Sequence, residues 1–112
     1  MRRNGRPYES FLDSVISHAS EERAEALLLP LLAHDAEHNG DLVHTLRVYF
    51  ALNGNASRAA EALFLHRNGL LYRLGRIEEL LRVPLSDSEI RLALELALRM
   101  IARKSPHGQL NE

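Results

Sequence analysis

Residues 52–74, LNGNASRAAEALFLHRNGLLYRL, constrain the fold more than any other stretch of this sequence. Asn53 and Gly54 interrupt the apolar periodicity that precedes them, and Asn55 is a good cap for a new helix. Only about three or four residues separate that short helix from a second one, which begins near Arg67. Two helices joined by so short a turn must cross each other, which is typical of a helix-turn-helix.

The small and apolar residues of this stretch fit two crossing helices. Leu63 and Leu65 bracket the turn as apolar anchors. Three alanines keep the first helix thin, so that the second can approach it closely: Ala59, Ala60 and Ala62. Four apolar side chains recur on one face of the second helix and should pack inward: Leu70, Leu74, Ile77 and Leu81. Residues 55–81 are therefore predicted to form a helix-turn-helix.

The opposite face of the second helix carries Asn68, Tyr72, Gly75, Arg76 and Glu79, with Leu71 and Arg73 on its flanks. Polar and basic groups occupy its first turns, and the acidic residues come only in its last turns. A helix that enters the major groove needs this order, because its first turns meet bases and phosphates. The pattern predicts a DNA-binding recognition helix over about residues 67–81.

Helical periodicity predicts two further helices ahead of this stretch. The first runs from about Tyr8 to Ala19. Ser20 is expected to cap the second, which Pro30 should end or kink. Residues 34–40, HDAEHNG, then read as a polar connection.

Two more helices complete the expected fold. Asp41 is expected to cap a third helix that Asn53 and Gly54 stop, and Ser86 or Asp87 caps a sixth that reaches about Arg103. The expected fold class is all-α, a compact bundle of about six helices that contains the helix-turn-helix. Residues 8–103 are expected to form a helical DNA-binding domain. The N-terminus, residues 1–7, and the tail, residues 104–112, are expected to be disordered.

Composition favours one intracellular domain. A chain of 112 residues with 46% hydrophobic residues can bury one modest core. Cysteine is absent, which removes disulfides and thiolate zinc sites and suits the cytoplasm. No stretch is long and apolar enough for a signal peptide or a membrane span. We therefore expect a cytoplasmic location and no membrane partner.

The charge of the chain is unevenly distributed. The net charge is −1, which by itself argues against nucleic-acid binding. Residues 9–41 carry eight acidic side chains and one arginine, whereas residues 55–82 carry five arginines and three glutamates. Local polarity matters more than the total when one face binds phosphate. The predicted helix-turn-helix thus lies in the basic half of the sequence.

A rival motif, HDAEH at residues 34–38, satisfies the H-x-x-E-H pattern of inverted zinc proteases. That chemistry needs a continuous helix and a third ligand from elsewhere. Pro30 and Asn39-Gly40 flank the motif closely, and no third-ligand helix is evident in so short a chain. We expect no catalytic residues, no metal site and no cofactor, and we rank adventitious metal binding ahead of catalysis.

A helical module that only dimerises is the competing function. In the sixth helix, apolar residues cover most sides and leave a narrow polar strip: Arg91, Glu95 and Arg99. Such a helix is either central in its own domain or half of a subunit interface. A module that only dimerised would have no need for a basic start to the recognition helix, so DNA binding remains the preferred interpretation.

Several sequence blocks, in order and at the right spacing, resemble a known family. They are Thr45-Leu46, Ala59 to Leu63, His66-Arg67-Asn68, Tyr72-Arg73-Leu74 and Arg76 to Leu80, and the likeness covers roughly residues 24–103. The stretch resembles the C-terminal DNA-binding domain of the purine-catabolism and sugar-diacid (PucR/CdaR-type) transcriptional regulators. More distantly, it is similar to the helix-turn-helix of the factor-for-inversion-stimulation class, whose members bind DNA as dimers.

The resemblance implies partners and site residues. It implies that the chain binds double-stranded DNA and forms a homodimer. It also implies an N-terminal sensor domain that is absent from this chain. The chain is then either an excised C-terminal domain or a freestanding short relative. Phosphate contacts fall to Asn55 and Ser57. Base and groove-rim contacts fall to His66, Arg67 and Asn68, and contacts farther along to Tyr72, Arg73 and Arg76.

Each of these residues also has a structural interpretation that stays open. His66 and Asn68 are candidate helix caps, and Tyr72 can pack on a neighbouring helix. Arg73 and Arg76 can pair with Glu79 or its neighbours. The chain also departs from the family at Gly69, where threonine is usual, and at Leu71, where polar or basic residues are frequent. We expect both departures to change sequence preference and affinity rather than the DNA-binding role.

Overall fold

A computed structural model describes residues 5–104, and in this part of the chain it contains six α-helices and no strand. The helices are α1 (Arg6–His18), α2 (Glu21–His38), α3 (Leu42–Ala51), α4 (Ala56–Ala62), α5 (Arg67–Leu81) and α6 (Ser88–Lys104). The all-α prediction is confirmed. Most of the two termini predicted to be disordered, residues 1–4 and 105–112, lies outside the described residues.

α2 is a single helix of 18 residues, so the prediction of a polar connection at residues 34–40 is wrong for residues 34–38. Ser20 caps the helix as expected, since its Oγ accepts a hydrogen bond from the Arg23 N–H at 3.1 Å. Pro30 lies on the exposed face, where water can satisfy the carbonyl group that it leaves without a partner. Leu28 and Leu31 flank it and are fully buried. Their packing outweighs the local cost of the proline.

The cap of α3 comes from α2, and the prediction that Asp41 provides it is wrong. The Asp35 carboxylate accepts hydrogen bonds from the N–H groups of Leu42 at 2.8 Å and Val43 at 3.0 Å. Asp41 occupies the N-cap position, but its carboxylate binds Arg73 instead. The last turn of α2 therefore supplies the hydrogen-bond acceptor that the first turn of α3 needs.

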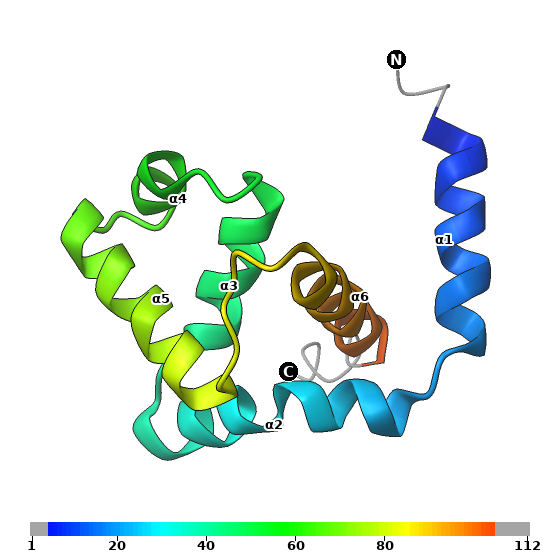
Figure 1. Ribbon diagram of the computed structural model, residues 1–112, viewed down its shortest axis with the longest axis horizontal. Helices are drawn as coiled ribbons and strands as arrows, with labels where there is room; N and C mark the ends of the chain where they lie inside the picture. The colour runs from blue at the N-terminus through cyan, green and yellow to red at the C-terminus, as the bar shows by residue number, and fades with distance from the viewer. Residues whose placement is uncertain (1–4, 105–112) are drawn as a thin grey trace, which may run out of the picture.

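The core lies where α2, α3, α5 and α6 meet, and Figure 1 shows α2 running beneath the other three. The largest side chains with no exposed surface come from α2, α3 and α5: Leu28, Leu31, Thr45, Leu46, Leu70 and Ile77. Leu70 and Ile77 are among the residues predicted to face inward. Leu74 is also buried, and Leu81 is half-buried, so the predicted inward face of the recognition helix is confirmed.

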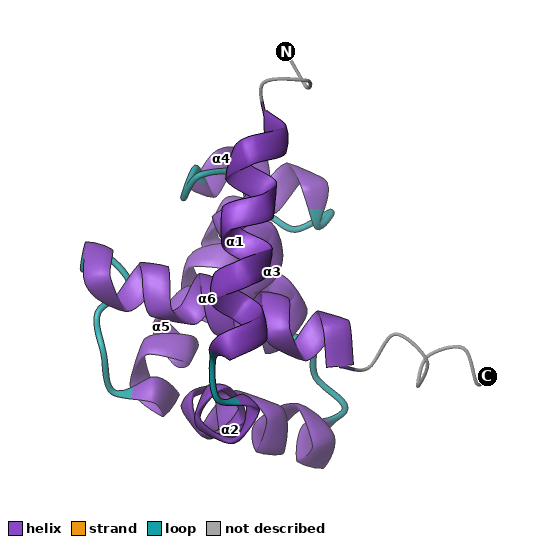
Figure 2. Cartoon of the chain, turned by 90° about the vertical axis from the view of Figure 1, so that its right-hand side faces the viewer, coloured by secondary structure: helices purple, strands orange, loops and turns teal. Residues whose placement is uncertain are grey.

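α6 is a central helix of the domain. Asp87, one of the two predicted caps, accepts hydrogen bonds from the N–H groups of Glu89 and Ile90. Among the α6 residues whose burial is described, 88–102, four side chains are buried against the rest of the domain: Leu94, Ala97, Leu98 and Met100. In Figures 1 and 2 the helix lies between α1 and the rest of the bundle. Its apolar surface is thus explained within one chain, although Leu92 stays 56% exposed.

α1 lies apart from the bundle. It starts at Arg6, earlier than predicted, and its buried side chain is Ile16 near its C-terminal end. Tyr8 and Phe11 are exposed. In Figure 1, α1 lies on the side of α6 opposite to α4 and α5.

Candidate nucleic-acid interface

α4, the following turn and α5 form the predicted helix-turn-helix on one side of the molecule (Figure 1). Asn55 caps α4, because its Oδ1 accepts a hydrogen bond from the Arg58 N–H at 3.0 Å. Ala59 and Ala60 are buried, as expected of small residues at the crossing point. A hydrogen bond of 2.8 Å from the Leu65 N–H to the Ala60 carbonyl closes the turn. These local contacts fix where α5 begins.

His66 is the N-cap of α5, so its structural interpretation is confirmed. Its Nδ1 accepts a hydrogen bond from the Asn68 N–H at 3.2 Å. The His66 ring remains exposed, and its Nε2 is not used in this contact. Asn68 receives no capping role, and its side chain is also exposed. Both residues stand at the start of the recognition helix, where a groove contact would be made.

Arg67 is the first residue of α5 and is exposed. Within the described residues, no carboxylate forms an ion pair with it or with the exposed Arg58 of α4. Ser57, in the first turn of α4, is exposed as well. The start of both helices therefore combines free backbone N–H groups with unpaired positive charge, which suits phosphate oxygens.

Tyr72 does not pack on a neighbouring helix, because its side chain is 73% exposed. It lies on the outer face of α5, and the flanking Leu71 is 41% exposed. Gly69 and Gly75 belong to the same helix, and a Cβ built on either would meet nothing within 4 Å. The outer face of α5 thus carries one exposed aromatic ring and one exposed leucine.

Arg73 points toward α3 and makes a contact that the sequence did not predict. Its guanidinium lies 2.6 Å from the Asp41 carboxylate and 3.1 Å from the Thr45 Oγ1, and its side chain is 30% exposed. Thr45 in turn donates to the Asp41 carbonyl at 2.9 Å. This network attaches the middle of the recognition helix to the N-terminus of α3.

Arg76 pairs with Glu79, one of the partners that the sequence offered for it. The two side chains lie 3.0 Å apart, and they are 38% and 71% exposed, respectively. Exposed pairs of this kind contribute about 0.3–0.5 kcal/mol and exchange partners readily. Arg76 can thus release Glu79 for a phosphate at little cost.

Phe64 is the residue at this interface that sequence reasoning missed. It occupies the turn with a φ of 57°, a left-handed conformation, and its side chain is 94% exposed. Leu63 and Leu65 on either side are half-buried. Three successive apolar residues across a tight turn cannot all point inward. This pattern could have predicted that one of them is exposed. The exposed ring lies two residues before His66, the cap of α5.

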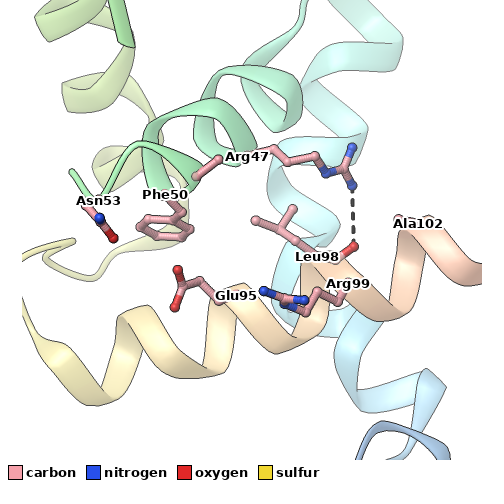
Figure 3. Close-up of a pocket in the computed structure, with 8 residues that line it drawn as sticks. Arg47, Phe50, Asn53, Glu95, Leu98, Arg99 and Ala102 are labelled. Atoms are coloured by element: carbon pink, nitrogen blue, oxygen red, sulfur yellow. Dashed lines mark hydrogen bonds between the residues drawn. The ribbon is translucent and has the colours of Figure 1, made fainter. Parts of the chain in front are cut away.

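A depression lies between α3 and α6, away from α4 and α5 (Figure 3). Its volume is about 450 Å³, and Phe50 and Leu98 contribute to its lining. Arg47 reaches across it to the Leu98 carbonyl at 3.4 Å. None of the lining residues comes from the helix-turn-helix, so this depression is separate from the candidate interface.

Comparison with known proteins agrees with this geometry. Residues 42–100 match the family described as the PucR C-terminal helix-turn-helix domain. The purine catabolism regulatory protein of Bacillus subtilis (strain 168) is 43% identical over 72 residues, which cover 64% of this chain and 14% of that protein. The carbohydrate diacid regulator of Escherichia coli (strain K12) is 42% identical over 64 residues, covering 57% and 17%.

A third relative is the proline-responsive transcriptional activator PutR of Bacillus subtilis (strain 168), 39% identical over 74 residues, which cover 66% of this chain and 18% of that protein. The chain therefore spans less than a fifth of the length of these three relatives. No solved structure matches the chain. The family consists of non-enzymatic domains of transcriptional regulators, and a helix-turn-helix of this type implies DNA binding. This chain belongs to the family of PucR C-terminal helix-turn-helix domains.

Proposed function

We propose that the chain binds double-stranded DNA sequence-specifically as the output domain of a bacterial transcriptional regulator, with α5 in the major groove. The observation that carries the proposal is the exposed, polar and basic start of α5, where Arg67 has no acidic partner within the described residues. The planar guanidinium of Arg67 suits the major groove, because it can make two hydrogen bonds to the edge of a guanine base.

The other proposed contact residues bind either phosphates or base edges. Asn55 and Ser57 lie at the start of α4 and bind phosphate together with the free backbone N–H groups there. The Asn55 Oδ1 is engaged in capping, so its amide NH₂ is the group that remains for phosphate. His66, Arg67, Asn68 and Tyr72 read base edges, and Arg76 binds phosphate after leaving Glu79.

Arg73 has a different part in this proposal from the one implied by the resemblance. Its bonds to Asp41 and Thr45 hold α5 against α3, so it sets the angle at which the recognition helix enters the groove. A phosphate contact by Arg73 requires that this ion pair be exchanged for one with DNA. Its first role is therefore to position α5.

Assembly and location are parts of the same proposal. A two-fold dimer would read two half-sites about one helical turn, ~34 Å, apart. An N-terminal sensor domain would govern that dimer in a longer regulator, and the protein would act in the cytoplasm, where bacterial DNA lies. In the described part of the chain, no helix has the length and apolar character needed to cross a membrane.

The test is fluorescence anisotropy of labelled duplex DNA at low and moderate salt with the wild type, Arg67→Ala and Arg23→Ala. Arg23 is an exposed arginine of α2, so it is a matched control for loss of one positive charge. We expect Arg67→Ala to weaken binding and to reduce the slope of log affinity against log salt by about 1, if it contacts phosphate, or to relax base preference, if it contacts guanine. Arg23→Ala should bind as the wild type does.

Absence of any wild-type affinity at low salt would contradict the proposal. The molecular mass from light scattering on the same sample then separates two outcomes. A stable dimer without DNA affinity would favour a protein-interaction module, whereas a monomer would favour a domain that needs a dimerising partner before it can bind.

A further inference from the structure

We propose that His34 and His38 form a two-histidine binding site for a late first-row divalent metal ion, of the kind represented by Ni²⁺, Cu²⁺ and Zn²⁺, on the last turn of α2. The two residues are four apart in one continuous helix, so their side chains project from the same face. Their imidazole rings are stacked, with centroids 4.3 Å apart and planes inclined by 22°.

The hydrogen bonding of His38 leaves the correct nitrogen free for a metal. Its Nδ1 lies 3.1 Å from the His34 carbonyl oxygen, which can only accept a hydrogen bond. Nδ1 therefore carries the proton, and Nε2 keeps its lone pair. A backbone carbonyl that receives the second ring N–H is the usual support of a metal-bound histidine, because it fixes the tautomer and the ring orientation.

His34 supplies the second imidazole nitrogen of the proposed site. Its Nδ1 is buried and makes no hydrogen bond, so packing and the stacking with His38 are what hold the ring. Nε2 is the nitrogen left for a ligand. Metal–nitrogen bonds of about 2.0–2.1 Å require the two nitrogens to approach to about 3 Å. The ion must also lie in the plane of each ring, so binding requires the two rings to turn from the stacked arrangement until both Nε2 atoms point to one ion.

The donor set determines which ion fits and what the ion can do there. Imidazole nitrogen suits zinc, copper and nickel, whereas magnesium and calcium prefer oxygen ligands. Within the described residues no group of three or more His, Cys, Asp or Glu side chains converges, so water would fill the other coordination positions. Such a site binds a metal without the third protein ligand that the zinc proteases use.

The site has a structural consequence because of what else the last turn of α2 carries. Asp35 lies between the two histidines in sequence and caps α3 through Leu42 and Val43. A metal that joins His34 to His38 cross-links this turn and opposes its fraying. Since ions that bind only the folded state stabilise it by mass action, metal binding should also protect the α2–α3 junction.

The experiment is calorimetric titration of the intact chain with NiCl₂, repeated with ZnCl₂ and MgCl₂. His34→Ala and His38→Ala test the site, and His18→Ala and His44→Ala are matched controls because both residues are exposed histidines on other helices. We expect one Ni²⁺ per chain, a loss of at least about tenfold in affinity for each of the two site variants, and no change for the controls. Mg²⁺ should give no binding.

Two further readouts keep the test independent of folding defects. Circular dichroism of each variant without metal confirms that it is folded. Ni²⁺ should raise the melting temperature of the wild type and of the controls but not of the site variants. Unchanged Ni²⁺ affinity in the folded site variants, or a melting temperature indifferent to Ni²⁺, would overturn the proposal.

Discussion

At the scale of single residues, the two arginines in the first half of α5 have different environments. Arg67 is exposed and unpaired within the described residues, whereas Arg73 is held by Asp41 and Thr45. Helical spacing alone places both near the outer side of the helix. The side-chain direction of Arg73 depends on an acceptor from α3, which is 32 residues away along the chain. The two residues should therefore respond differently to mutation.

We predict that Arg73→Ala lowers the free energy of unfolding by about 1 kcal/mol, because a partly exposed ion pair and one hydrogen bond are lost. Arg67→Ala should leave it within about 0.5 kcal/mol of the wild type, as is usual for an exposed side chain without partners. Urea unfolding followed by circular dichroism measures both values. If Arg73→Ala were as stable as Arg67→Ala, the positioning role of Arg73 would be wrong.

A second prediction concerns the glycines. Gly69→Ala should stabilise the protein by up to about 1 kcal/mol, because alanine is the better helix former and its Cβ would meet nothing within 4 Å. Gly54→Ala is the contrasting control, since Gly54 has a φ of +74° and lies against the Tyr49 ring. It should destabilise the protein. The same urea series measures both, and equal effects of the two changes would contradict the argument.

At the scale of elements, side chains of one helix make hydrogen bonds and ion pairs that hold a neighbouring helix or connection in place. α3 has ten residues and no capping bond from its own N-cap residue, so its first N–H groups depend on Asp35 of α2. α5 is joined to α3 through Arg73, and the Glu78 side chain accepts from the Leu85 N–H at 2.8 Å in the connection to α6. These three carboxylate and guanidinium contacts join elements that sequence periodicity treats as separate.

The prediction at this scale is that Asp35→Ala lowers the free energy of unfolding by about 0.5–2 kcal/mol, the range for loss of a helix cap. Asp35→Asn should retain only part of that stability, because its single amide oxygen can replace one of the two carboxylate oxygens that accept from Leu42 and Val43. Glu37→Ala, an exposed acid on the same turn, is the matched control and should change little. Thermal melts of the three variants decide the point, and an Asp35→Ala melt equal to that of Glu37→Ala would exclude the capping role.

At the scale of the whole molecule, the folding unit is larger than the region matched by the family. The match begins at residue 42, yet Leu28 and Leu31 of α2 have no exposed surface and fill the core beneath α3, α5 and α6. α1 is different, because Ile16 is its one buried side chain within the described residues. α2 is thus part of the domain core, and α1 adds little to it.

We predict that a chain starting at Ser20 folds cooperatively and keeps its DNA affinity, with a stability loss of about 1.5–3 kcal/mol from the burial of Ile16. A chain starting at Leu42 should not unfold cooperatively, because it lacks two buried leucines that are each worth about 2–5 kcal/mol as leucine-to-alanine changes. Calorimetric melting of both truncations is the measurement. A cooperative transition in the shorter chain would show that α2 is dispensable.

Sequence by itself determined what depends on neighbours along the chain. Helix periodicity, the caps at Ser20 and Asn55, the turn before α5 and its inward face are local properties, and the structure confirms them. The sequence offered Ser86 or Asp87 as the cap of α6, and the structure selects Asp87. The tertiary structure decided whatever depends on a distant partner. Packing of Leu28 and Leu31 carries α2 past Pro30, and Asp35 replaces Asp41 as the cap of α3 because Arg73 binds Asp41. Such choices are settled by which groups meet when the helices pack, and a one-dimensional pattern does not contain that information.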